Sequence, residues 1–399
     1  MSNLISPPPI YRVSPLTWIK KNLFSTWYNS LLTLISLLFL YGISSNLIIW
    51  IFTQAQWGVI SANLRLFLVG QYPLPLLWRT WTTLAIIMGL GGFSWGILTR
   101  SQPLFTPINL TGLGIIAILF ALLAIPISIL SSLKLLGMLI MLVLMAFLGQ
   151  KLRQKFTNLG TWLPLLWLLT FFVLLWLLEG GLFLKPVRLD DLSGLILTVL
   201  TAVVSIVLSF PLGVLLALGR QSSLPVIRWL SIAYIEVIRG LPLLGILFMA
   251  QVMLPLILPE GLRVDRVVRA ISGFTLFSAA YLAENVRGGL QSIPKGQKEA
   301  AKALGLNTFF VLILVVLPQA LRTVIPTIVG QFISLFKDTS LLAIVGLSDL
   351  LGMSRSILAN PKFIGSDREV YLFVAMIYWC FCYSLSWISR RLEKEGNRG

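Results

Sequence analysis

Histidine is absent from this 399-residue chain, and charged residues of either sign are scarce. Asp, Glu, Lys and Arg together make up 11% of the residues, whereas a soluble globular chain carries about 25%. The composition therefore argues against a soluble enzyme. Without histidine, the chain also lacks the commonest general base and the commonest metal ligand. The two cysteines, Cys380 and Cys382, lie two positions apart in an apolar run, so we expect packing residues rather than metal ligands.

Long apolar runs dominate the rest of the sequence. Hydrophobic residues make up 57% of the chain, and the mean hydropathy is +0.91. A helix of about 20 apolar residues crosses a lipid bilayer. The sequence therefore predicts an all-α polytopic membrane protein with about ten transmembrane helices. The predicted spans are residues 31–52, 80–98, 113–130, 134–150, 162–183, 194–218, 228–256, 268–290, 308–328 and 369–389.

The few charges are mostly basic, with 31 Lys and Arg, 14 Asp and Glu, and a net charge of +17. In a polytopic membrane protein such an excess indicates loops held on the cytoplasmic side rather than a nucleic-acid partner. If the N-terminus is cytoplasmic, the ten spans leave 16 basic and three acidic residues on that side. We therefore expect a multi-pass protein with both termini in the cytoplasm.

The composition changes near residue 186. The earlier spans are rich in Leu and Trp, whereas the later spans carry Glu, Arg, Gln and Asp. This change predicts four parts of the chain. They are a cytoplasmic tail (1–30), about five accessory transmembrane helices (31–185), a five-helix functional core (190–390) and a cytoplasmic C-terminal tail (391–399).

The most informative stretch is the predicted cytoplasmic loop at residues 291–306. Pro294 suits the first position of a short helix, because its missing N–H costs nothing there. Gly305 suits the end of that helix, where a positive φ is needed. Between them, Ala300, Ala301 and Ala303 leave the backbone open to close approach, and three lysines share one helical face. Such a helix fits a groove on a soluble partner better than it fits lipid.

At these residues the sequence resembles the permease subunits of ABC importers. Their loop pattern is Glu-Ala-Ala, three residues, Gly, nine residues, Ile, one residue, Leu-Pro. Here every spacing is kept, with Val in place of Ile. The resemblance implies a coupling helix that docks on an ATP-binding subunit. It assigns that role to Glu299, Ala300, Ala301, Gly305 and Pro318.

A finer resemblance covers residues 190–390. It rests on residues 236–244 (EVIRGLPLL), 283–289 (AENVRGG) and 336–341 (FKDTSL), which look like the polar amino acid branch of these permeases. The N-terminal extension, with residues 63–73 (NLRLFLVGQYP), resembles the larger permease of general L-amino acid importers. The resemblance implies a type I ABC importer core in a bacterial inner membrane, moving L-amino acids by alternating access.

The same resemblance implies partner chains. They are a second homologous permease, two copies of a cytoplasmic ATP-binding subunit and a periplasmic amino-acid-binding protein. The chain has no Gly-x4-Gly-Lys-Ser/Thr loop, so it is not expected to bind ATP itself. We therefore expect no cofactor on this chain and no catalytic or metal site, with ATP and Mg on the partner ATPase.

Two pairs of charges lie within predicted spans. Glu236 and Arg239 are three residues apart, as are Glu284 and Arg287, so each pair shares a helical face. Charges at membrane depth line a path or pair with each other. The pairs are candidate contacts for an amino acid zwitterion. The alternative, which we favour, is that they are structural ion pairs near the inner gate.

A further polar cluster, Lys337, Asp338 and Thr339, lies in residues 331–353, where spanning character is weak. A partly re-entrant loop that lines a cavity tolerates such groups. We expect this segment to contribute to the outer gate or the substrate path. A solvated outer loop is the alternative.

Residues 92–96 (GFSWG) match the nucleophile-elbow pattern of hydrolases. Because no histidine is present to act as the base, we interpret Gly92 and Gly96 as a site of close helix packing. A polytopic membrane enzyme is therefore disfavoured. A secondary transporter or a channel for polar solutes explains the intramembrane charges but not the spaced loop motif.

Overall fold

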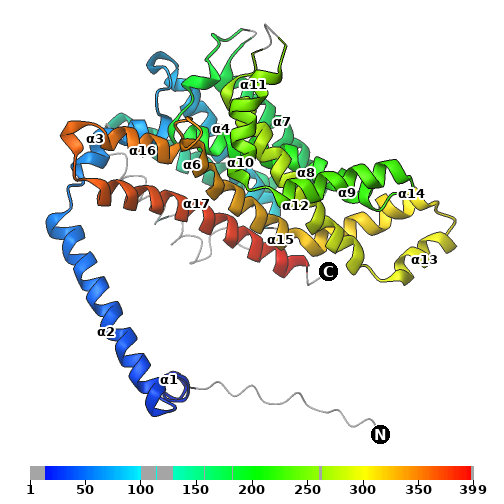
Figure 1. The fold of residues 1–399 in the computed structure, drawn as a ribbon, viewed down its shortest axis with the longest axis horizontal. Helices are drawn as coiled ribbons and strands as arrows, with labels where there is room; N and C mark the ends of the chain where they lie inside the picture. The colour runs from blue at the N-terminus through cyan, green and yellow to red at the C-terminus, as the bar shows by residue number, and fades with distance from the viewer. Residues whose placement is uncertain are drawn as a thin grey trace. The chain divides into compact units, whose positions relative to one another are not determined.

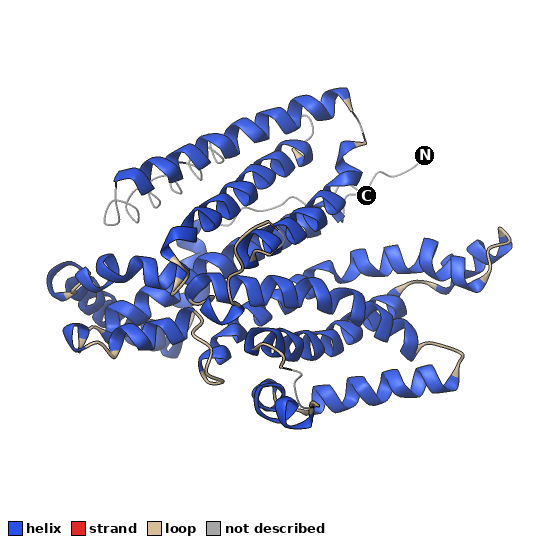
Figure 2. Cartoon of the chain, turned by 90° about the horizontal axis from the view of Figure 1, so that it is seen from above, coloured by secondary structure: helices blue, strands red, loops and turns tan. Residues whose placement is uncertain are grey.

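A computed structural model of the chain describes residues 14–99, 114, 129–156, 158–181, 183–259 and 263–396. Within these residues the protein is built from helices, and Figure 2 shows no strand. The helices in chain order are α1 (Pro15–Leu23), α2 (Trp27–Ile49), α3 (Gly58–Val69), α4 (Leu77–Leu98), α6 (Ile129–Lys155), α7 (Leu159–Glu179), α8 (Gly194–Arg220), α9 (Pro225–Gly240), α10 (Leu243–Phe248), α11 (Leu254–Ile257), α12 (Arg266–Ser292), α13 (Lys295–Ala303), α14 (Thr308–Phe310), α15 (Leu317–Asp338), α16 (Leu350–Leu358) and α17 (Asp367–Gly396).

Short turns of other helix types join several of these helices. Single π-helical turns, in which the hydrogen bonds span five residues, cover Trp50–Gln54, Met249–Met253 and Val311–Val316. Short 3₁₀ turns cover Leu74–Leu76, Leu189–Asp191, Thr339–Ala343 and Pro361–Phe363. The chain divides into two compact units, Met1–Trp57 and Gly58–Gly399. The second unit contains every candidate site residue.

Seven helical segments are long and apolar enough to cross a membrane. They are Trp27–Gln54, Leu74–Leu98, Leu130–Lys155, Leu159–Glu179, Gly194–Arg220, Thr308–Ala343 and Asp367–Ser386. Each matches a predicted span, so the prediction of an all-α polytopic membrane protein is confirmed. The predicted span 113–130 lies almost entirely outside the described residues.

The predicted span 228–256 is not one straight helix. Helix α9 and the segment Leu243–Ile257 meet at a bend of 104°. At the bend, Leu241 and Pro242 have extended backbone angles. Pro242 lacks an N–H and restricts the residue before it to extended conformations, so the helix cannot continue through this point. The two halves together make an eighth candidate span.

The predicted span 268–290 is present as α12, but α12 is not among the seven apolar segments. Its position explains its composition. It packs against α8, α9, α10 and α15 (Figure 1), and it buries small residues such as Gly273, Ala279 and Ala283. A helix surrounded by other helices needs small residues for close approach rather than large apolar residues for lipid.

The accessory helices α4 and α6 cross at glycines. An ideal Cβ at Gly92 would lie 2.1 Å from the carbonyl oxygen of Leu142, and one at Gly149 would lie 2.4 Å from that of Phe93. Ser94, between the two predicted packing glycines, accepts a hydrogen bond from Trp167 Nε1 at 3.0 Å. The interpretation of residues 92–96 as a packing site is therefore confirmed.

Helix α3 packs on the C-terminal half of the chain. Its Val59, Leu64 and Phe67 are buried against α16 and α17, where the Phe67 and Phe373 rings lie 5.1 Å apart. Figure 1 shows α3 and α16 at one end of the second unit and α9, α13 and α14 at the other. We call these the α16 end and the α13 end. Helix α15 runs between the two ends, from the turn Val311–Val316, which contacts α13, to the turn Thr339–Ala343, which contacts α16.

Candidate functional site

The predicted coupling helix is α13, which follows α12 after Ile293 and Pro294. Pro294 is the N-cap residue, directly before the helix, with φ −56° and ψ 141°. It does not take the first helical position, which the sequence predicted for it. The extended angles fit a proline between two helices, because they redirect the chain without requiring an N–H donor. The helix itself begins at Lys295, one residue later than predicted.

Helix α13 has a buried side and an exposed side. Ala301 is buried on the side of α13 that packs against the turn Val311–Val316, and its carbonyl accepts a hydrogen bond from Leu306 N–H at 3.3 Å. Glu299 and Ala300 are exposed, as is Leu304, which is 84% exposed. The buried alanine fixes the helix to the chain, while its neighbours remain available to a partner.

Gly305 ends this helix in the left-handed region, with φ +81°, as predicted. Its N–H donates to the carbonyl oxygen of Lys302 at 2.9 Å. No atom lies within 4 Å of an ideal Cβ at Gly305, so backbone conformation rather than space favours glycine here. Pro318 lies in the first turn of α15, directly after the π-helical turn, and is exposed.

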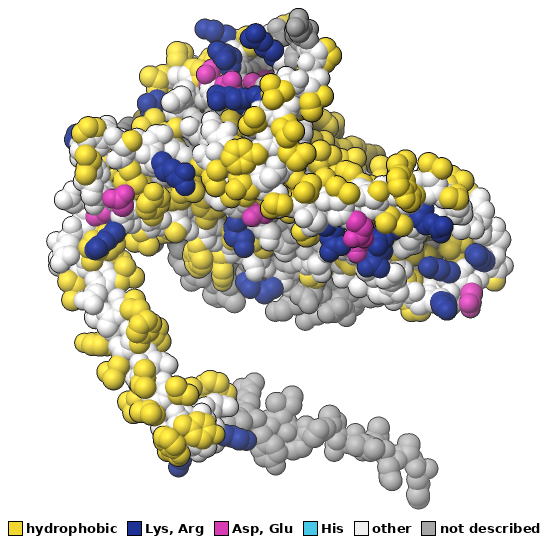
Figure 3. Space-filling model, in the orientation of Figure 1, with side chains coloured by type: hydrophobic (Ala, Val, Ile, Leu, Met, Phe, Trp, Pro, Cys, Tyr) yellow, Lys and Arg dark blue, Asp and Glu magenta, His cyan; other side chains and the backbone are white. Residues whose placement is uncertain are grey.

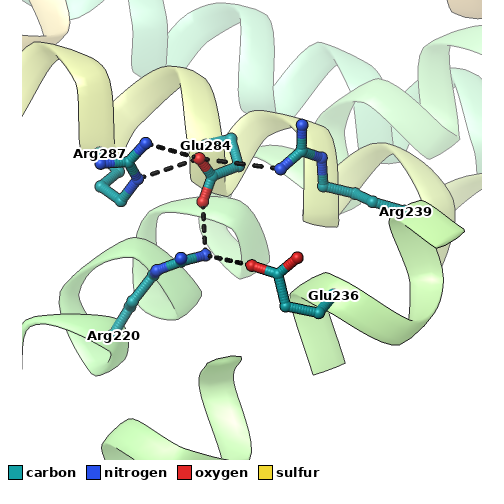
Figure 4. A network of polar contacts seen from close by, with 5 residues as sticks. All are labelled: Arg220, Glu236, Arg239, Glu284 and Arg287. Atoms are coloured by element: carbon teal, nitrogen blue, oxygen red, sulfur yellow. Dashed lines mark hydrogen bonds and ion pairs between the residues drawn. The ribbon is translucent and has the colours of Figure 1, made fainter. Parts of the chain in front are cut away.

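Figure 4 shows a network of five charged residues near the α13 end, on α8, α9 and α12. At its centre is Glu284, with a side chain 15% exposed. Arg287 donates to Glu284 Oε2 through Nε at 2.9 Å, and its Nη2 lies 2.8 Å from the same oxygen. Arg220 Nη1 lies 2.7 Å from Glu284 Oε1 and 3.1 Å from Glu236 Oε1. Arg239 Nη1 lies 3.8 Å from Glu284 Oε2.

One of the two predicted pairs forms as expected. Glu284 and Arg287 pair across one turn of α12. Within the described part of the chain, however, Glu236 pairs with Arg220, and Arg239 with Glu284. Helical spacing places Glu236 and Arg239 on one face, but both side chains reach across to neighbouring helices. The ion pairs therefore join three helices.

Arg220 was not among the residues singled out from the sequence, where it is only one of many basic residues beside a predicted loop. It ends α8, and its partners lie 16 and 64 residues further along the chain. No local pattern encodes pairs at such separations. One signal in the sequence could have identified Arg220. It lies at the end of a span, and each of the next two spans carries an acidic residue, Glu236 and Glu284.

The segment 331–353 is not a re-entrant loop in its first part. Helix α15 continues to Asp338, and a 3₁₀ turn then covers Thr339–Ala343. Thr339 is fully buried and donates to the carbonyl oxygen of Phe336 at 2.7 Å, while Asp338 is half-buried and Lys337 is exposed. The cluster therefore lies on a packed helix end and not in a solvated loop.

Helix α15 exposes a polar face. Its exposed positions include Arg322, Thr323, Thr327 and Lys337, and none of its exposed residues is a large hydrophobic one. The apolar helices α2, α6 and α7 behave differently and expose many Leu, Phe and Trp side chains. In Figure 3 hydrophobic side chains cover much of the visible surface, and charged side chains gather in a few patches.

A buried carboxylate lies just beyond α15. Asp349 caps α16 by accepting hydrogen bonds from the backbone N–H groups of Leu351 at 3.2 Å and Gly352 at 2.9 Å. Tyr378 Oη donates to Asp349 Oδ2 at 3.3 Å. Burial raises the pKa of Asp349 to about 6, despite these donors and nearby Arg355, which lower it. Asp349 was not singled out in the sequence analysis, where no spacing or motif points to it.

Comparison with known proteins places this geometry in a family. Residues 209–395 match the model of the "binding-protein-dependent transport system inner membrane component". The inner membrane amino-acid ABC transporter permease protein YhdY of Escherichia coli (strain K12) is 38% identical over 96% of this chain and 94% of its own length. The glutamate/glutamine/aspartate/asparagine transport system permease protein BztC of Rhodobacter capsulatus is 35% identical over 98% of this chain and 96% of its own length.

A solved structure described as an amino acid ABC transporter with histidines is 28% identical, covers 51% of this chain and 92% of that chain, and has a TM-score of 0.46. The family match and the two full-length relatives define a membrane component of binding-protein-dependent transport. The chain belongs to the family of amino-acid ABC transporter permeases, the membrane subunits of ABC importers. It is a multi-pass inner membrane protein, and the secondary transporter and channel readings are not favoured.

Proposed function

We propose that this chain carries L-amino acids across the inner membrane by alternating access, with ATP hydrolysis on a separate subunit. The names of the relatives support the substrate class, since one is an amino-acid permease and another serves glutamate, glutamine, aspartate and asparagine. The observation that carries the coupling part of the proposal is the exposed side of α13, held between two long helices.

Helix α13 is suited to transmit force from an ATP-binding subunit. Glu299, Ala300 and Leu304 project from the chain, and the small residues allow a partner to approach the backbone closely. The opposite side is fixed by Ala301. Movement of α13 passes to α12, because only Ile293 and Pro294 separate the two helices. In turn, α12 packs on α8 and α15, which are both candidate spans.

This docking predicts the rest of the assembly. Two copies of a cytoplasmic ATP-binding subunit engage α13 of this chain and of a second homologous permease. A periplasmic amino-acid-binding protein delivers the substrate. ATP and Mg belong to the ATP-binding subunits, so this chain performs no chemistry on the substrate and needs no cofactor. In this arrangement the α13 end and both termini are cytoplasmic.

The polar face of α15 is the candidate wall of the translocation path. A charged side chain on a spanning helix costs roughly 2.5–3.5 kcal/mol when it faces lipid. Arg322 and Lys337 are both exposed on this helix. Water in a path, or the second permease, avoids that cost. Asp338 and Thr339 lie where this face ends, so we place them at the substrate path or the outer gate.

Gly305→Asp tests the coupling role. The tagged chain is purified from native membranes, co-purifying chains are identified by mass spectrometry, and amino acid uptake is measured. We expect wild type to retain an ATP-binding subunit and a second permease. The variant should lose the ATP-binding subunit and uptake while remaining in the membrane.

Gly346→Asp is the matched control. Gly346 has the same φ of +81° and the same open surroundings, but it precedes α16. We expect Gly346→Asp to retain the ATP-binding subunit. Normal uptake in Gly305→Asp, or recovery of the wild-type chain alone, would contradict the proposed function.

A further inference from the structure

Helix α9 packs on α8 and α12 but buries few of its own residues. Of its residues, only Ser231 and Ile235 are buried. Tyr234 adds one hydrogen bond, from its Oη to the carbonyl oxygen of Leu276 at 2.8 Å. An open groove of about 580 Å³ lies along the α8–α9 contact, lined by Leu216 of α8 and by α9 residues that include Leu230 and Val237. A helix with so little buried surface is a candidate moving element.

By contrast, α8 and α12 are packed tightly together. An ideal Cβ at Gly213 of α8 would lie 2.6 Å from Leu282 Cβ and 3.1 Å from the carbonyl oxygen of Ala279, both on α12. Interdigitated helices of this kind move as one body, because the interface has no room for gradual sliding. Since α12 leads directly into α13, the α8–α12 pair forms the rigid extension of the candidate coupling helix.

Helix α9 also has a joint at each end. Four residues, 221–224, connect it to α8. At its other end, Gly240 is followed by Leu241 in an extended conformation, and the helix axis turns by 104°. Rotation at these two points moves α9 without disturbing the tight α8–α12 contact.

Two ion pairs hold α9 to this rigid pair. Arg220 of α8 reaches Glu236 at 3.1 Å, and Glu284 of α12 reaches Arg239 at 3.8 Å. Glu284 keeps Arg220 and Arg287 as partners, at 2.7 and 2.8 Å, whether or not α9 is in place. Release of α9 therefore leaves no buried charge without a partner. Glu236 and Arg239, which are both exposed, pass into water.

We propose that Arg220 and Glu284 are positioning residues that hold α9 closed against the α8–α12 pair, and that α9 swings away from this pair in each transport cycle. The inference rests on the proposed function, because α13 supplies the movement. The permanent pairs with Glu284 keep release reversible, since opening exchanges two partly exposed ion pairs for hydration. The bend at Leu241 acts as the hinge.

A disulfide between α8 and α9 tests the movement. Gly219→Cys and Ser231→Cys are combined in a chain whose own cysteines, Cys380 and Cys382, are replaced by Ser. The ideal Cβ at Gly219 lies 3.3 Å from Ser231 Cβ, close to the roughly 3.5–4.5 Å that a disulfide requires. The complex with its partner chains is reconstituted in vesicles, and amino acid uptake is measured before and after oxidation.

The control pair is Ala250→Cys with Gly273→Cys, whose Cβ atoms are 3.6 Å apart. It links α12 to the segment beyond the hinge and leaves α9 free. Oxidation should lower uptake by about ten-fold or more in the α8–α9 pair, with recovery on reduction, and should spare the control pair. Undiminished uptake in the oxidised α8–α9 pair, or equal loss in both pairs, would overturn the inference.

Arg220→Gln provides a second readout. The variant loses the pair with Glu236, which holds α9, together with the pair to Glu284, and should raise ATPase activity in the absence of the binding protein by about two- to five-fold, as expected for a partly exposed pair. Arg228→Gln is the control, because Arg228 is exposed and forms no ion pair within the described residues. Equal ATPase activity in both variants would count against a holding role.

The two proposals fail in different ways. Failure of the proposed function appears in the wild-type complex, as absence of a bound ATP-binding subunit before any crosslink is made. Failure of this inference appears as normal uptake in an oxidised complex that still carries that subunit. The cysteine pairs and the Arg220→Gln variant leave the exposed side of α13 unchanged, so none of them is expected to release the ATP-binding subunit.

Discussion

Gly96 of α4 lies directly against Ala146 of α6, so that an ideal Cβ at Gly96 would be 1.9 Å from the carbonyl oxygen of Ala146. A backbone atom cannot move aside as a flexible side chain can. Gly96→Leu should therefore separate the two helices and lower the stability of the chain by about 1–3 kcal/mol. Gly91→Leu is the control, because no atom lies within 4 Å of its ideal Cβ. Thermal unfolding in detergent measures both, and equal unfolding midpoints would contradict the close contact.

The two neighbouring alanines of α13 should respond differently to enlargement. Ala301→Leu adds volume to a buried position and should lower the stability of the chain by about 1–3 kcal/mol. Ala300→Leu adds volume on the exposed side, so it should leave stability unchanged and weaken binding of the ATP-binding subunit. Thermal unfolding and co-purification separate the two effects. Similar loss of stability in both variants would show that α13 has no free side.

Asp349 should make the stability of α16 depend on pH. Its pKa is raised by burial from 3.8 to about 6, so the folded chain binds its proton more tightly than the unfolded chain does. This contribution to stability is therefore full below about pH 4 and is lost as pH rises through 6, with a total of up to about 3 kcal/mol.

Asp349→Asn keeps a capping side chain but removes the charge. Between pH 5 and pH 7.5 the unfolding midpoint of the wild-type chain should fall more than that of the variant. At pH 7.5 the variant should be the more stable chain. Parallel pH profiles for the two chains would exclude Asp349 as the titrating group.

Asp338 should matter for transport rather than for assembly. It is half-buried at the end of the polar face of α15, where a carboxylate can meet a substrate or a gate residue. Asp338→Asn should lower uptake by about ten-fold, as expected for the loss of one charged hydrogen-bonding partner, with the complex intact. Asp367→Asn is the control, since Asp367 is an exposed residue in the first turn of α17. Unchanged uptake in Asp338→Asn would remove this residue from the path.

Much of the fold could be predicted because membrane helices are encoded locally. An apolar run of sufficient length must satisfy its own backbone hydrogen bonds in lipid, and it does so by forming a helix. The residues of the run are therefore the residues of the spanning helix. This is why seven predicted spans were found again, six of them with boundaries shifted by at most six residues, whereas the span predicted at 308–328 continues to Ala343. Gly305 was predictable for a similar reason, because the end of a helix requires a positive φ that glycine adopts without strain.

The ion-pair network was predicted only in part. The Glu284–Arg287 pair depends on helical spacing alone and appears as expected. The partners of Glu236 and Arg239 depend on which helices lie nearby, and a sequence read span by span does not contain that information. Arg220 was missed for the same reason.

The sequence by itself determined the class of protein, the positions of its apolar spans and the short helix between two of them. These follow from composition, run length and residue spacing, which act over a few turns of helix. Tertiary structure decided that α12 is central, that Thr339 is buried and that Arg220 joins α8 to α9 and α12. Those outcomes depend on contacts between residues distant in the chain, where packing and charge select one partner among many.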